Sequence, residues 1–112
     1  LALISTITSL IFGMLHLTNL DGDSSKAVFQ QVFYATCIGL IFSVTRITFN
    51  SIFVGAFLHF LLDLQVTIYQ PLTADNWLNV IMLFLPIAVI SILLIISIDH
   101  LLEKNSIEFL NP

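Results

Sequence analysis

Four long apolar stretches constrain the fold of this 112-residue chain more than any other feature of its sequence. They cover about residues 1–20, 27–47, 51–69 and 77–98. A helix needs about 20 mostly apolar residues to cross a bilayer, and each stretch has or nearly has that length. The sequence therefore predicts an all-α fold, a polytopic transmembrane helix bundle of about four spans, organised as a single membrane domain over residues 1–112.

The composition agrees with a membrane protein. Hydrophobic residues make up 58% of the chain and charged residues only 9%, whereas a soluble domain carries roughly a quarter charged residues. The three basic residues are scattered and form no patch, so nucleic acid is not an expected partner. The expected surroundings are those of a lipid bilayer.

Polar segments connect the apolar stretches and mark the predicted membrane surfaces. Residues 21–26 include two aspartates and a lysine, Arg46 closes the second stretch, and a polar tail covers residues 99–112. In a four-span topology Arg46 and Lys104 lie on one side, which the positive-inside rule places in the cytoplasm. Because the chain starts at Leu1, inside an apolar run and without a methionine, we expect a fragment of a longer protein.

Three ionisable side chains inside the predicted spans are the main functional candidates: His16, His59 and Asp63. Each costs on the order of 2–3 kcal/mol or more at mid-bilayer. In the third span, small and polar residues recur every four positions, which places them on one face of a helix. That face is expected to meet protein or a water-filled cavity. Its members are Ser51, Gly55, His59, Asp63 and Thr67.

The first span carries a similar pattern. Ser5, Ser9 and Gly13 form a ridge of small residues, which lets helix backbones approach closely. His16 follows one turn beyond this ridge, and Phe12, one turn before His16, is placed to pack against its ring. The first span is therefore predicted to pack tightly on a neighbouring helix.

The chemistry of these residues stays open on their pattern alone. A lone histidine could simply hydrogen-bond a neighbouring helix, and an aspartate one turn away could be its structural partner. Two histidines and a carboxylate on facing helices favour a shared functional site. Such a site could bind a metal ion, or it could act in hydrolysis through a general base and orienting groups.

Two motifs resemble those of the CAAX protease and bacteriocin-processing family, also called the Abi family. Residues 12–16 (Phe-Gly-Met-Leu-His) look like its FxxxH motif, and residues 59–63 (His-Phe-Leu-Leu-Asp) look like its HxxxN/D motif. The resemblance covers about residues 5–67. It implies a glutamate-dependent intramembrane endopeptidase in the bacterial plasma membrane, with peptides or membrane-associated protein tails as substrates. It implies no organic cofactor and does not require a metal.

The resemblance also implies roles for individual residues. His16 would help to activate the attacking water, and His59 with Asp63 would lie on the side of the oxyanion, the three side chains meeting in one polar cavity between the first and third spans. Phe12, Ser51 and Gly55 would support them.

Two departures from the family pattern leave open whether this chain is itself an enzyme. The glutamate motif EExxxR is missing, because no glutamate precedes Glu103. Asp63 stands where asparagine is common, and an ionised aspartate cannot donate a hydrogen bond to an oxyanion. The alternatives are a non-catalytic membrane protein, such as a bacteriocin self-immunity protein, and a fragment of a transporter or channel whose path the polar stripe lines.

Overall fold

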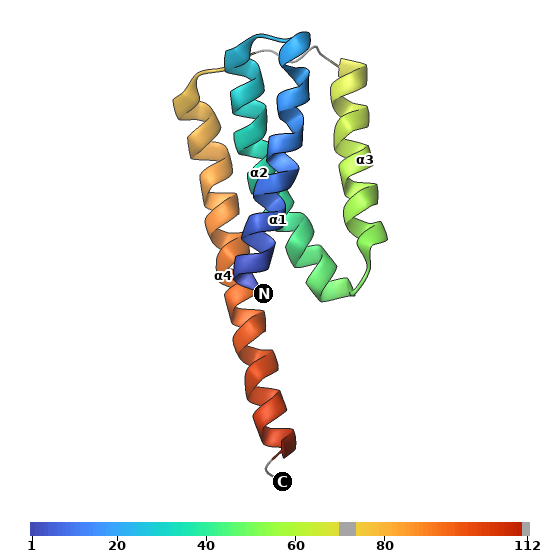
Figure 1. Cartoon of the computed structure of the whole chain (residues 1–112), viewed down its shortest axis with the longest axis vertical. Coiled ribbons are helices and arrows are strands. Elements are labelled where there is room, and N and C mark those ends of the chain that lie inside the picture. Colours follow the sequence, from blue (N-terminus) through green and yellow to red (C-terminus); the bar gives the residue numbers. More distant parts are fainter. Residues whose placement is uncertain (70–73, 111–112) are drawn as a thin grey trace.

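The structure of the chain, a computed structural model, describes the backbone of residues 1–69 and 74–110 and the side chains of residues 1–64 and 74–106. Its elements are all helices (Figure 1). The predicted all-α class is confirmed for this part of the chain. In order, the elements are α1 (Ala2–Leu15), the short 3-10 helix η1 (His16–Asp21), α2 (Ser25–Phe49), α3 (Ile52–Tyr69) and α4 (Trp77–Leu110).

Among the described residues, three helical stretches are long and apolar enough to cross a membrane: Ala2–Asp21, Ser25–Phe49 and Trp77–Ser106. The first of them joins α1 to η1. The described apolar part of α3, Ile52–Leu64, is shorter than these three. The polar tail expected from residue 99 onward does not leave the helix, because α4 continues to Leu110 and projects beyond the other helices (Figure 1).

The contact between α1 and α2 depends on small side chains. Ser5, Ser9 and Gly13 are all buried, as the predicted ridge requires. A Cβ atom added at Gly13 would lie 2.7 Å from the backbone oxygen of Val32 and would overlap the Thr36 hydroxyl. In a bilayer such close packing replaces the hydrophobic effect as the force that holds helices together.

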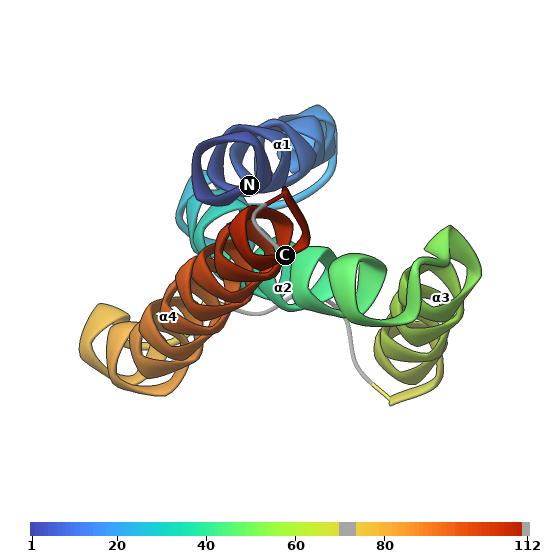
Figure 2. The same ribbon diagram turned by 90° about the horizontal axis from the view of Figure 1, so that it is seen from below.

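Helix α2 is the centre of the bundle, because it contacts α1, α3 and α4 (Figure 2). On the α4 side, Cys37 and Leu40 of α2 form a core cluster with Ala88 and Ile95 of α4. Helix α3 packs against α2, and within the described residues its backbone stays away from those of α1 and α4. The backbones of α1 and α3 are therefore spaced apart, and side chains reach across between them.

Local hydrogen bonds define where the helices begin and end. The Ser24 hydroxyl caps the start of α2 by accepting from the amide of Ala27 at 3.3 Å. Asn50 ends α2 in the left-handed conformation, with φ 47°, and turns the chain toward α3. The Gln30 side chain donates to the carbonyl of Asp75 at 2.8 Å and accepts from its amide at 2.9 Å, which fastens the segment before α4 to α2.

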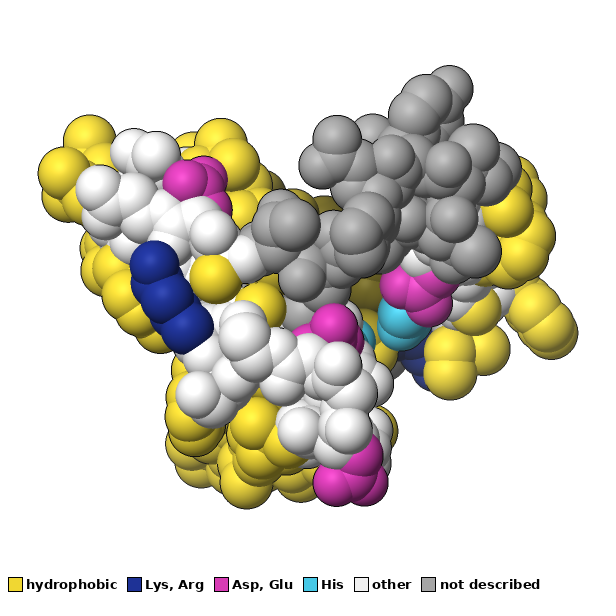
Figure 3. Space-filling view, turned by 90° about the horizontal axis from the view of Figure 1, so that it is seen from above, with side chains coloured by type: hydrophobic (Ala, Val, Ile, Leu, Met, Phe, Trp, Pro, Cys, Tyr) yellow, Lys and Arg dark blue, Asp and Glu magenta, His cyan; other side chains and the backbone are white. Residues whose placement is uncertain are grey.

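The end of the bundle that holds η1 and the start of α4 is polar. Seen from above in Figure 3, acidic and other polar side chains cover the described helix ends, and hydrophobic side chains cover the flanks. Asp21, Asp23, Lys26 and Asp75 are exposed at this end. This division matches a protein whose flanks meet lipid and whose ends meet water.

Candidate functional site

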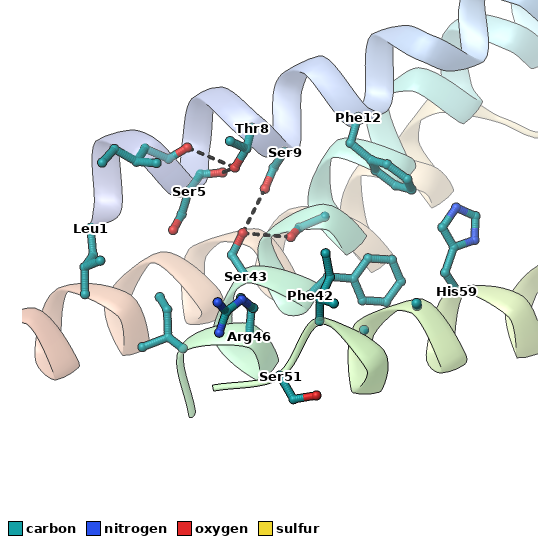
Figure 4. Close-up of a pocket in the computed structure, with 16 residues that line it drawn as sticks. Leu1, Ser5, Thr8, Ser9, Phe12, Phe42, Ser43, Arg46, Ser51 and His59 are labelled. Atoms are coloured by element: carbon teal, nitrogen blue, oxygen red, sulfur yellow. Dashed lines mark hydrogen bonds between the residues drawn. The ribbon is translucent and has the colours of Figure 1, made fainter. Parts of the chain in front are cut away.

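A cavity of about 720 Å³ lies between α1, α2 and α3 (Figure 4). It opens sideways between α1 and α3, whose backbones lie apart and which meet at one end through the rings of Phe12 and His59. Its walls mix hydroxyl groups with aliphatic and aromatic side chains. The lining includes Ser9, Phe12, Phe42, Ser43, Arg46, Ser51, Gly55 and His59.

His59 and Asp63 lie one turn apart on α3, within hydrogen-bonding distance of each other. The Nδ1 atom of His59 lies 3.1 Å from the Oδ2 atom of Asp63. The histidine side chain is 33% exposed and that of Asp63 68% exposed. The imidazole is therefore sheltered at the cavity while its carboxylate partner stands further out. Since Asp63 engages Nδ1, Nε2 is the ring nitrogen that is available to interact with a bound molecule.

The Phe12 ring packs against the imidazole rings of both His16 and His59. Its ring meets the ring of His16 edge to face at a centroid distance of 5.3 Å, and that of His59 in the same way at 5.0 Å. Phe42 of α2 stacks on His59 from another side, at 5.8 Å and an interplanar angle of 16°. Figure 4 shows the three rings of Phe12, Phe42 and His59 gathered at one end of the cavity.

His16 takes a position determined by a change of helix type. The α-helix ends at Leu15 and the chain continues as the 3-10 helix from His16. The Nδ1 atom of His16 lies 3.2 Å from the backbone oxygen of Phe12, within hydrogen-bonding distance. The imidazole therefore folds back along its own helix, against the Phe12 ring.

The structure brings together only part of the predicted site. Phe12, Ser51, Gly55 and His59 line the cavity, whereas His16 and Asp63 touch the lining residues from outside it. The cavity is also less polar than expected, because aliphatic and aromatic side chains alternate with the hydroxyl groups. The side chain of Thr67, the last member of the predicted stripe, lies outside the described residues.

Phe42 is the member of this cluster that sequence reasoning missed. A phenylalanine inside an apolar span looks like any lipid-facing residue, so it gave no signal. Its position four residues before Arg46 places both on one face of α2, and both line the cavity. A search for apolar residues that share a face with the span's single charge would have found it.

Within the described residues, no group of three or more His, Cys, Asp and Glu side chains is arranged to hold a metal ion.

The comparison with protein families agrees with the two motifs. A family profile described as "Type II CAAX prenyl endopeptidase Rce1-like" matches residues 2–65, more than half of the chain. The chain belongs to this family. The suspected relation to CAAX proteases is confirmed, and the matched segment of this Rce1-like chain includes Phe12, His16, His59 and Asp63. No curated protein and no solved structure matches the chain.

Family membership and the apolar helices together identify an integral membrane protein. The Rce1-like match ends at residue 65, so it covers α1, α2 and most of α3 and leaves out α4. Helix α4 packs on α2 through Ala88 and Ile95 and supplies no described residue to the cavity lining. We interpret α4 as a helix that supports the site from behind.

Proposed function

We propose that this chain carries the two-histidine part of a CAAX-protease-like intramembrane endopeptidase, which hydrolyses a peptide bond in prenylated or other membrane-associated peptides. The observation that carries the proposal is the His59–Asp63 pair on the wall of a laterally open cavity, inside the segment that matches the Rce1-like family. A substrate anchored in the bilayer could enter such a cavity from the side.

The proposed reaction adds water across the peptide bond. The hydroxyl group of the water joins the carbonyl carbon, the C–N bond breaks, and a proton goes to the leaving amine. His16 is proposed to assist the activation of the water as part of a general base. His59, oriented by Asp63, is proposed to stabilise the oxyanion by donating a hydrogen bond from Nε2, which requires that Nε2 carries a proton while Nδ1 meets Asp63.

The resemblance assigns the main water-activating role to a glutamate motif that these 112 residues do not contain. The proposal is therefore tested on the complete gene product. The proposed location in a bacterial plasma membrane is a prediction that rests on the resemblance alone.

The test is cleavage of a fluorogenic prenylated peptide by protein reconstituted in liposomes. His16→Ala and His59→Ala should each lower kcat/KM by about 100-fold or more, the usual contribution of an acid–base group. His100→Ala is the matched control, because His100 lies on the outer part of α4, away from the cavity. It should cleave like the wild type. Cleavage retained in both cavity variants would contradict the assignment.

The same preparation distinguishes the two other functions predicted from the sequence. A protein that cleaves nothing but protects cells from a bacteriocin would be the self-immunity protein. Ion or solute flux into the liposomes that is lost in Asp63→Ala would indicate a transporter or channel. Either result would replace the peptidase proposal.

A further inference from the structure

We propose that the cavity between α1, α2 and α3 holds a membrane phospholipid, with the phosphate on the Arg46 guanidinium and an acyl chain directed toward the aromatic rings around His59. The inference does not depend on the proposed peptidase activity, because it rests on the charge, depth and lateral opening of the cavity.

The positive charge of Arg46 in the lining favours binding of an anion. Among the described side chains that line the cavity, Arg46 carries the one permanent charge, and none is a carboxylate. The Nη1 atom of Arg46 donates to the Oδ1 atom of Asn50 at 2.8 Å, a neutral partner that leaves the positive charge in place. A guanidinium has five donors in a planar fork, which suits phosphate oxygens. Figure 4 shows Arg46 near Ser43, whose hydroxyl already donates to the carbonyl of Gly39 at 3.2 Å, so the guanidinium supplies the donors for an anion here.

The depth of Arg46 matches the headgroup region. Helix α2 has 25 residues, and Arg46 lies in its last turn. At 1.5 Å per residue the helix is about 37 Å long, whereas the hydrocarbon core is about 30 Å thick. The last turn of α2 therefore reaches the level at which lipid phosphates lie. Basic pockets between transmembrane helices are recognised lipid-headgroup sites.

The rest of the cavity suits an acyl chain. Ile4, Ile47 and Ile52 contribute aliphatic walls, and Phe12 with Phe42 closes the end beside His59. Gly55 lies on the cavity wall close to α2, where an added Cβ atom would make ordinary van der Waals contact with Phe42 and Thr45, each at 3.6 Å. The volume of about 720 Å³ lies within the range of ligand sites. Since the backbones of α1 and α3 lie apart and the two helices meet only where Phe12 reaches His59 among the described ring contacts, a lipid can enter between them from the bilayer without unfolding the bundle.

The test counts retained phosphatidylglycerol by native mass spectrometry, using the full chain released from nanodiscs of phosphatidylglycerol and phosphatidylcholine. Arg46→Gln should lower the number of retained phosphatidylglycerol molecules by about fivefold or more. Arg46→Lys, which keeps the charge but loses the fork, should fall in between. Lys104→Gln is the matched control: it also removes one positive charge, but on the part of α4 that projects beyond the cavity. It should retain the wild-type amount.

A second variant tests the acyl chain separately from the charge. Gly55→Leu fills the cavity and leaves Arg46 in place, so it too should lose the retained lipid, while circular dichroism verifies that the variant is helical. Full retention in Arg46→Gln or in Gly55→Leu would overturn the proposal. An equal loss in Lys104→Gln would also overturn it, because the lipid would then follow overall charge and not this cavity.

Discussion

At the scale of single residues, the described site is organised by contacts to the His59 ring. Asp63 holds its Nδ1 atom, Phe12 meets it edge to face, and Phe42 stacks on it. Three neighbours from three helices leave the ring few orientations. An imidazole held in this way loses little conformational freedom when a substrate binds. Such preorganisation favours a role in stabilising the charge that develops in a transition state.

Substitutions at Asp63 test whether its hydrogen bond or its charge matters. Asp63→Ala removes the partner of His59 and should lower peptide cleavage by about 10- to 100-fold, the range for groups that orient a functional imidazole. Asp63→Asn keeps an oxygen that can accept from Nδ1 and should retain most of the activity. The measurement is kcat/KM on the same prenylated peptide.

Asp23→Ala is the matched control for these variants, because Asp23 is an exposed carboxylate in the loop before α2. It should behave like the wild type. Equal losses in the alanine and asparagine variants of Asp63 would show that the negative charge, and not the hydrogen bond, supports His59. Wild-type activity in both would remove Asp63 from the site.

At the scale of elements, the small residues between α1 and α2 determine where the cavity lies. Gly13 meets Val32 and Thr36, and the Ser9 hydroxyl lies 3.5 Å from that of Ser43. This tight contact sets α1 close to α2 and places Phe12 beside α3. Helix packing and site geometry therefore depend on the same residues.

Gly13→Ala tests this packing. The new methyl group would come within 2.7 Å of the Val32 carbonyl oxygen, which belongs to the α2 backbone and cannot rotate away. Overpacking of this kind costs about 1–3 kcal/mol. Thermal unfolding in detergent should therefore begin at a clearly lower temperature.

The control for Gly13 is Gly22→Ala, because a Cβ atom added at Gly22 has no atom within 4 Å. This variant should unfold like the wild type. If Gly13→Ala also unfolds at the wild-type temperature, α1 and α2 are further apart than the structure indicates.

At the scale of the whole molecule, the segments that connect the helices lie at two opposite ends, which we expect at the two membrane surfaces. The turn between α2 and α3 lies toward the same end as the outer part of α4, whereas η1 and the start of α4 lie at the opposite end (Figure 1). Helix α4 has 34 residues and is about 50 Å long, so it extends well past a hydrocarbon core of about 30 Å. Its polar outer part is thus expected in water.

Cysteine labelling checks this topology. With the buried Cys37 replaced by serine, single cysteines at Ser25, Ser51 and Ser106 can be labelled by a maleimide that does not cross membranes. Cysteines at 51 and 106 should react from the same side, which the positive-inside rule assigns to the cytoplasm. The cysteine at 25 should react only from the other side. Reaction of positions 25 and 51 from one side would mean that α2 does not span the membrane.

Much of this organisation followed from local sequence patterns. The apolar stretches predicted the helices, the spacing of Ser5, Ser9 and Gly13 predicted the close contact of α1, and the four-residue spacing placed His59 and Asp63 on one face of a helix. These features depend on residues within a few turns of one another. Helix geometry alone relates such residues, so the sequence was sufficient for them.

Only the tertiary structure decided which side chains line the cavity. The distance from Phe12 to Phe42 and His59 depends on how three helices pack, and those residues are far apart in the chain. His16 stays outside the cavity because the α-helix gives way to a 3-10 helix at that residue. Asp63 lies one turn beyond His59 on α3, outside the cavity lining, with 68% of its side chain exposed. No local pattern encodes these relations, since they arise from the packing of whole helices.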